Sequence, residues 1–163
     1  MPVYRYLMRE YSLNYVTARQ PFVPGDLLLR AEQDLGNAEA DDVFALPILL
    51  DLRWIDLLAY PTEQFKLLLA RRQSLDVPAP APPCAYIVRD EGSFGMLRIF
   101  TNFAEARGYR REHQTIITTD VAEGAQWVFP HLASPVGSVP ELLAEIDATC
   151  GRLDGPPQDT DDA

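Results

Sequence analysis

Two stretches decide the fold: CAYIVRD at residues 84–90 and QTIITTD at residues 114–120. Each is a short run of apolar and β-branched residues that leads directly into a segment with helical spacing, EGSFGMLRIF after the first and VAEGAQWVF after the second. A strand followed by a helix, twice in succession, predicts a parallel sheet whose strands end at one common edge. We expect activity, if any, in the loops at that edge, residues 89–93 and 118–120.

Length and composition indicate a single domain. The chain has 163 residues, of which 47% are hydrophobic, enough for one core of ordinary size. No run of about 18 apolar residues occurs, so we expect no transmembrane segment. The first 15 residues carry charges within their apolar stretch and lack a small-residue cleavage site, which argues against a secretory signal. These features predict a cytoplasmic protein with its α/β domain in residues 1–150.

The charge balance limits the classes of partner. A formal net charge of −10 argues against nonspecific binding of nucleic acid, which requires Lys and Arg to displace counterions from phosphates. Part of this charge lies in residues 151–163, GRLDGPPQDTDDA, which have little to bury and are predicted to form an acidic disordered tail. The acidic surface suits either solubility or a basic partner.

The cysteines and histidines give no metal-ligand pattern. Cys84 and Cys150 lack CxxC spacing, so buried free thiols are favoured over a disulfide. His113 and His131 are expected on the surface as isolated residues. We therefore expect neither a metal nor a cofactor.

The N-terminal third reads as a hairpin followed by a helix. Two β-rich runs, VYRYLM at 3–8 and LNYVTARQ at 13–20, predict an antiparallel pair that opens the sheet. The segment PGDLLLRAEQDLG at 24–36 has apolar residues on one helical face and ends in glycine. The following NAEADD, residues 37–42, reads as an acidic linker.

The next unit contains a strand buried on both faces. It is FALPILLDLR, whose ILL run at 48–50 is typical of a central parallel strand. WIDLLAY at 54–60 reads as a partly buried loop. Pro61, Thr62 and Glu63 then open a helix, which leads into the extended connection VPAPAPPC at 77–84.

The segment GMLRIFTNF, residues 95–103, is compatible with two structures. Its Ile, Phe and Thr residues suit a strand, whereas a helix places Met96, Ile99, Phe100 and Phe103 on one face. We favour the helix, ending at Gly108. Further on, Asp120 is predicted to cap one helix, and the capping box at residues 138–141 opens a last helix that stops before Gly151.

These elements predict an α/β fold, with a single mixed sheet of about five strands and four to five helices. The hairpin comes first and parallel βα units follow. This layout resembles that of SpoIIAA-like proteins. The sequence stretches that carry the resemblance are ILLDLR at 48–53, AYIVRD with SFGMLRIF at 85–100 and TTDVAEGAQWV at 118–128. That family belongs to the structural group shared by STAS domains and the lipid-binding SEC14 fold. The resemblance covers Val3 to Leu132 and supports fold better than function.

One branch of this resemblance implies a regulatory protein. STAS-type antagonists dock to a kinase-like partner until a Ser or Thr at a helix N-terminus is phosphorylated. The matching position lies near Tyr60-Pro61-Thr62, although the usual DSSG-like motif is absent. Thr62 is thus a possible phosphosite, with a simple helix-capping role as the alternative.

The other branch implies an apolar cavity beneath a mobile helix. The residues that could line it are Phe94, Met96, Phe100 and Phe103. An aromatic stripe at helical spacing is also what an ordinary core requires. A homodimer contact is a third possibility, because residues 94–107 carry more apolar side chains than one helical face needs.

Polar residues follow the predicted parallel strands, and we define them as the carboxyl rim. They are Asp51, Arg53, Asp56, Arg89, Asp90, Ser93, Thr119 and Asp120. Their acids and arginines suit acid–base chemistry, protein recognition, or helix caps and surface ion pairs. The chain lacks a GxSxG motif, and GSFG at 92–95 lacks the Lys of a phosphate loop, although its amides could hold an anion.

Three functions follow in order of preference. The first is a non-enzymatic, regulatory module that binds a protein partner through the carboxyl rim. The second is a carrier or sensor of an apolar small molecule or lipid. The third is an enzyme that uses the acids of the rim.

Overall fold

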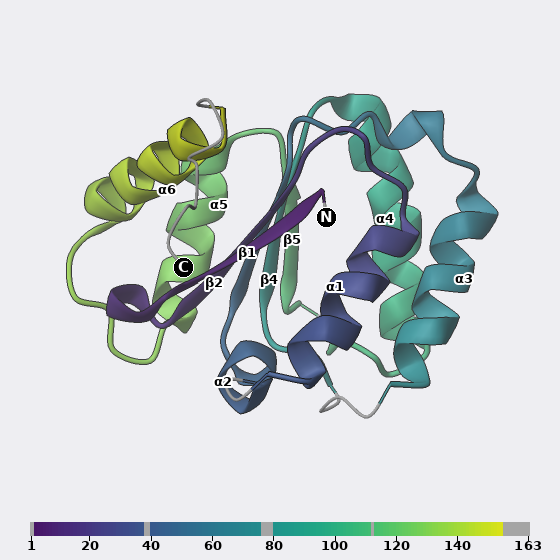
Figure 1. Ribbon diagram of the computed structural model, residues 1–163, viewed down its shortest axis with the longest axis horizontal. Coiled ribbons are helices and arrows are strands. Elements are labelled where there is room, and N and C mark those ends of the chain that lie inside the picture. Colours follow the sequence, from purple (N-terminus) through teal and green to yellow (C-terminus); the bar gives the residue numbers. More distant parts are fainter. Residues whose placement is uncertain (1, 38–39, 76–79, 112, 155–163) are drawn as a thin grey trace, which may run out of the picture.

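The computed structural model describes residues 2–37, 40–75, 80–111 and 113–154. Its described residues form three layers, with one sheet between two sets of helices (Figure 1). The sheet has five strands and is mixed, which confirms the predicted α/β class.

The sheet follows the order of the chain, β1-β2-β3-β4-β5. Its first pair is the predicted antiparallel hairpin, closed by a short 3-10 turn, and the remaining neighbours are parallel. Every parallel connection thus leads to the adjacent strand in the same direction across the sheet. The strands are β1 (Val3–Met8), β2 (Leu13–Ala18), β3 (Ile48–Leu52), β4 (Cys84–Val88) and β5 (Thr115–Thr118).

The helices that connect the parallel strands lie on one face, and the C-terminal helices cover the other (Figure 1). The first group comprises α1 (Gly25–Leu35), α3 (Thr62–Gln73) and α4 (Glu91–Ala106). The second group comprises α5 (Val121–Val128) and α6 (Val139–Asp154), and the short α2 (Ala40–Ala45) lies near one end of the sheet. No described helix has the length and apolar character needed to cross a membrane.

The two faces of the sheet are packed differently. Residue alternation on β3 sends Leu49 towards α5 and α6, where it is fully buried. Ile48 and Leu50 face α1, α3 and α4 and are only half-buried, although β3 is the central strand. The face under α1, α3 and α4 is therefore the more loosely filled one.

Helix α5 approaches the sheet closely. It contacts β3, β4 and β5, whereas α3 packs mainly against α1 and α4. A Cβ atom added to Gly124 of α5 would lie 2.2 Å from Cδ1 of Ile87, a fully buried residue on β4. Glycine at this position therefore permits a short distance between helix and sheet.

Helix α4 is helical as predicted, but its buried face differs from the expected one. The buried side chains are Ser93, Leu97, Thr101 and Ala104, which recur at helical spacing. In contrast, Ile99 is 45% exposed and Phe103 is 37% exposed. The expected face was wrong because the aromatic stripe lies along the side of α4, next to α3, rather than beneath it.

Two other expectations on secondary structure need correction. Helix α2 begins within the predicted acidic linker and extends beyond it to Ala45. The segment 54–60 is partly buried as predicted, with Ile55 and Leu57 completely buried and Leu58 59% exposed. Helix α6 continues through Gly151 to Asp154, because a single glycine does not end a helix whose other side chains keep packing. The rest of the predicted tail, 155–163, and residues 77–79 of the proline-rich connection lie outside the described residues. Both cysteines are free and buried, as predicted.

Candidate functional site

The carboxyl rim lies along one edge of the sheet, but the order of the described strands does not create a crevice there. In open α/β sheets, ligands bind beyond the strand C-termini where the strand order reverses, because adjacent loops then diverge. Among the strands that the structure describes, the parallel order runs from β2 to β5 without a reversal. The loops therefore all turn the same way, and no such crevice is formed between them.

Most of the acidic residues of the rim cap the N-termini of helices. Asp56 accepts a hydrogen bond from the Leu58 amide at 3.1 Å, at the start of a short 3-10 helix. Asp90 caps α4 through the Ser93 amide at 2.8 Å, and Asp120 caps α5 in the same way. The hydrogen bonds from α4 hold the pKa of Asp90 below its ordinary value. These carboxylates thus serve the helix N-termini.

Asp51 forms a buried network rather than part of an exposed site. Its carboxylate is fully buried and accepts hydrogen bonds from Arg53 at 2.9 and 2.8 Å. The Tyr15 hydroxyl donates to it at 2.9 Å and lies 3.0 Å from the Cys150 sulfur of α6. Burial, together with the Asp51 charge, raises the pKa of Tyr15, which therefore stays protonated. The network joins β2, β3 and α6.

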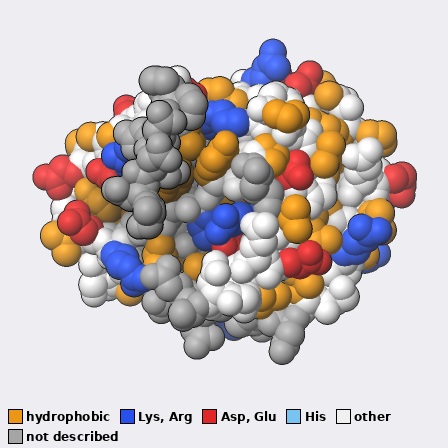
Figure 2. Space-filling view, in the orientation of Figure 1, with side chains coloured by type: hydrophobic (Ala, Val, Ile, Leu, Met, Phe, Trp, Pro, Cys, Tyr) orange, Lys and Arg blue, Asp and Glu red, His pale blue; other side chains and the backbone are white. Residues whose placement is uncertain are grey.

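The other predicted polar residues do not converge. Arg89 lies 3.8 Å from Asp90 at the surface, and Thr119 is exposed. Ser93 is fully buried, and its hydroxyl has no hydrogen-bond partner within the described part of the chain. Recognition of a protein partner by the rim therefore stays a prediction. On the face seen in Figure 2, acidic, basic and hydrophobic side chains are interspersed.

Thr62 is the first residue of α3, and the capping position belongs to Pro61. The Thr62 hydroxyl does not cap the helix but points to the sulfur of Met96 on α4, 3.7 Å away. It is half-buried in this position. Phosphorylation of Thr62 stays a prediction, and its phosphate would have to displace this contact.

A cavity lies between the sheet and the helices α1, α3 and α4. Its volume is about 110 Å³. Most of its wall is apolar, with strand residues such as Leu50 below and helix residues such as Leu68 and Leu97 above. The half-burial of Leu50, in the middle of a central strand, is explained by this space.

The aromatic residues predicted to line such a cavity are distributed over three places. Phe100 lines the cavity. Met96 and Phe103, again with Phe100, line a shallow groove between α3 and α4, and Phe94 packs at the edge of the core beneath. A homodimer contact through the apolar residues of 94–107, with Phe94, Met96, Phe100 and Phe103, stays a prediction.

One end of the cavity is basic, which the sequence did not lead us to expect. Arg5 from β1, Arg72 from α3 and Arg110 from the segment before β5 all contribute to its wall. Tyr109 lies beside them and accepts a hydrogen bond from Arg72 at 2.6 Å. We define Arg5, Arg72 and Arg110 as the basic end. The available sequence signal was weak: Arg110 stands in a polar segment a few residues before a predicted strand.

The basic end is poor in negative charge. Asp34 is buried and forms ion pairs with Arg5 at 2.5 Å and with Arg30 at 2.6 Å, so two arginines share one carboxylate. Burial lowers the pKa of Arg5, and the nearby charges of Arg30 and Arg72 add to this shift. The described side chains include no group of three His, Cys, Asp or Glu residues suited to a metal ion.

Comparison with known proteins assigns no family. No protein-family model, curated protein or solved structure matches this chain. The site must therefore be interpreted from its own geometry.

Proposed function

We propose that this protein is a carrier or sensor of a small apolar molecule, which it binds between the sheet and helices α1, α3 and α4. The observation that carries the proposal is the mostly apolar cavity of about 110 Å³, partly open to solvent, between the sheet and the helices of one face. The opposite face of the same strand is closely packed, since Leu49 there is completely buried. The unfilled space is thus specific to one side of the sheet.

The size of the cavity defines the size of the ligand. An engineered apolar cavity of roughly 150 Å³ accommodates benzene. A volume of about 110 Å³ is therefore suited to a short alkyl chain or a small ring rather than to a two-chain lipid. Among the lining residues, Leu50, Leu68 and Phe100 offer the apolar contacts that such a group needs.

The carboxyl rim is the alternative binding surface. Its recognition of a protein partner, and the SpoIIAA-like regulatory role attached to it, have less physical support because three of its acids cap helices and Asp51 is buried. An enzyme based on these acids has less support still. Residues that hold local structure are poorly placed to exchange partners or protons.

Native mass spectrometry and methyl NMR together test the carrier proposal. Native spectra of protein purified from its host should show a retained small mass that denaturing spectra lack. Titration of ligand-depleted protein with 1-hexanol should shift the methyl signals of Leu50, Leu68 and Leu97. The signals of Leu49 and Leu142, which pack on the other face, provide the internal control. No retained mass and no selective methyl shift would overturn the proposal.

A further inference from the structure

We propose that the ligand of this cavity carries one carboxylate, which the basic end binds while the apolar part of the ligand fills the rest of the space. This inference rests on the proposed function and specifies its ligand class: a short-chain or small aromatic carboxylate. Arg110 would supply the principal contact, with Arg72 and Arg5 beside it.

Arg110 is the strongest evidence for an anionic ligand. Only 7% of this residue is exposed, and an arginine side chain keeps its charge at all ordinary pH values. Its Nη1 donates to the carbonyl of Pro82 at 2.6 Å, but its buried Nε has no hydrogen-bond partner among the described residues. A buried charge without a counter-ion is costly, and such a charge within a cavity wall indicates that the counter-ion is supplied by something else.

The neighbours of Arg110 do not neutralise it. Its guanidinium lies 5.7 Å from the ring centres of Tyr86 and Tyr109, and these are cation–π contacts and not ion pairs. No Asp or Glu side chain in the described ranges forms an ion pair with it, whereas Arg5 and Arg30 share Asp34. Among the described residues, the contacts of the Arg110 guanidinium are thus a backbone carbonyl and two aromatic rings.

Arg5 and Arg72 extend the same positive region. Nη1 of Arg5 is buried and, like Nε of Arg110, has no partner in the described part of the chain. Arg72 donates to the Tyr109 hydroxyl, and its guanidinium lies 5.4 Å from the ring centre of Phe44. Three guanidinium groups therefore line one end of the cavity, and Asp34, the carboxylate that forms an ion pair there among the described residues, is already shared.

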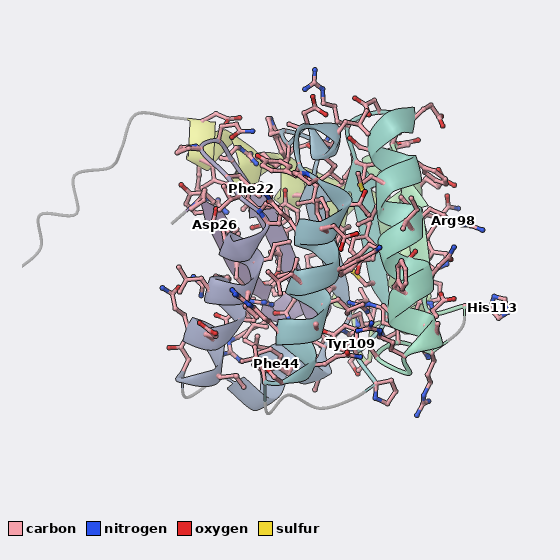
Figure 3. All side chains as sticks on the ribbon, turned by 90° about the vertical axis from the view of Figure 1, so that its right-hand side faces the viewer. Phe22, Asp26, Phe44, Arg98, Tyr109 and His113 are labelled. Carbon is pink, nitrogen blue, oxygen red and sulfur yellow. The ribbon has the colours of Figure 1, made fainter. Side chains whose placement is uncertain are left out.

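The basic end and the apolar part lie at different ends of the sheet. Arg110 precedes β5, and Arg72 is in the last turn of α3, so both are on the side where the parallel strands begin. Leu52 and Leu57 line the cavity nearer the side where the strands end. Figure 3 shows Phe44 and Tyr109 near one end of the molecule and Phe22 near the other. This arrangement matches a ligand with a charged head and an apolar tail.

A carboxylate fits this arrangement better than a bulkier anion. Arginine forms paired hydrogen bonds with the two oxygens of a carboxylate, and these charge-assisted bonds are stronger than neutral ones. A carboxylate has few atoms, so most of the volume of about 110 Å³ remains for the apolar group. Inorganic phosphate has no apolar part and would leave the leucine-lined space empty.

Matched ligands test the inference. Isothermal titration at pH 7 would compare hexanoate, 1-hexanol and inorganic phosphate with ligand-depleted protein. Hexanoate should bind about ten- to a hundredfold more tightly than 1-hexanol, the range expected for hydrogen bonds to a charged group. Equal binding of hexanoate and 1-hexanol would overturn the carboxylate inference and leave the carrier proposal intact. Binding of neither would overturn both, and binding of phosphate alone would show an anion site that needs no apolar group, contrary to the inference.

Two substitutions locate the head group. Arg110→Met removes the charge and keeps an extended side chain, and it should abolish the preference for hexanoate while 1-hexanol still binds. Arg98→Met is the matched control, because Arg98 is exposed and points away from the body of the molecule (Figure 3). If Arg110→Met does not fold, Arg72→Gln tests the same end, and it should reduce the preference at least several-fold. An unchanged preference in the folded variant would place the head group elsewhere.

Discussion

Filling the cavity should stabilise the protein, whereas the same change one residue away should destabilise it. The two substitutions are Leu50→Phe and Leu49→Phe, on adjacent positions of β3 that face opposite sides of the sheet. Leu50 lines the cavity and is half-buried, while Leu49 is fully buried against the C-terminal helices. Both variants replace leucine with phenylalanine, so the change in side-chain type is the same. A difference between their free energies of unfolding therefore reports the difference in packing between the two faces.

The expected size of the effect follows from the cavity volume. Enclosed empty apolar space costs about 24 cal/mol per Å³, so a partly open cavity of about 110 Å³ corresponds to at most about 2.6 kcal/mol. One phenylalanine fills part of this space, and we expect Leu50→Phe to raise the free energy of unfolding by about 1 kcal/mol. Leu49→Phe forces extra atoms into a filled core and should lower it by about 1–3 kcal/mol.

Urea unfolding followed by circular dichroism measures both values. The slope with denaturant should be the same for both variants, because neither changes the surface exposed on unfolding by much. Leu50→Phe should also weaken the binding of 1-hexanol, since it occupies the same volume. Equal destabilisation by the two substitutions, with 1-hexanol binding unaffected, would show that the two faces are packed alike and would refute the reasoning.

Three further predictions concern other parts of the molecule. Asp51→Ala should lower the free energy of unfolding by about 3 kcal/mol in urea titrations, because it leaves Arg53 without its buried partner. Loss of a catalytic turnover at unchanged stability would instead support the enzyme hypothesis. Asp90→Asn should be less stable than the natural protein near neutral pH. In thermal melts this difference should begin to shrink as the pH falls below about 4, the ordinary pKa of an aspartate, and should disappear only below the lowered pKa that Asp90 has in the folded state. Gly95→Ala should raise the melting temperature, because Gly95 has open space around it, whereas Gly124→Ala should lower it. A higher melting temperature for both variants would mean that α5 can move away from the sheet.

The succession of strands and helices could be predicted because it depends on local patterns. The runs at 84–88 and 115–118 alternate with amphipathic segments, and Asp90 and Asp120 stand where helix caps are needed. These signals act over a few residues and need no knowledge of distant parts of the chain.

The buried face of α4 could not be predicted from the same patterns. Both the stripe with Met96 and Phe103 and the stripe with Leu97 and Ala104 satisfy helical spacing. The choice between them depends on where α3 lies beside α4, which is a property of the tertiary structure. A hydrophobic stripe shows that a helix packs against something but does not show which neighbour it meets.

The candidate site was harder still to predict. Charged residues after a strand suggested a functional edge, yet Asp51 is buried in a structural network and Asp56 caps a turn. The basic end joins Arg5, Arg72 and Arg110, which are distant in sequence and meet only through the sheet order and the path of α3. Nothing in the local sequence distinguishes them from surface arginines.

The chain order of the sheet also determines when each face is covered as the protein is made. Residues up to about 120 contain all five strands and the helices of the first layer, so a nascent chain of this length can already assemble them. Among the described helices, α5 and α6 cover the face that carries Leu13, Leu49 and Ile87, and both come later, from the remainder of the chain. At about 5–20 residues per second, synthesis of that remainder takes roughly 2–9 s. Until α5 and α6 pack, this face of the sheet is an exposed apolar surface of the kind that promotes aggregation of incompletely folded chains.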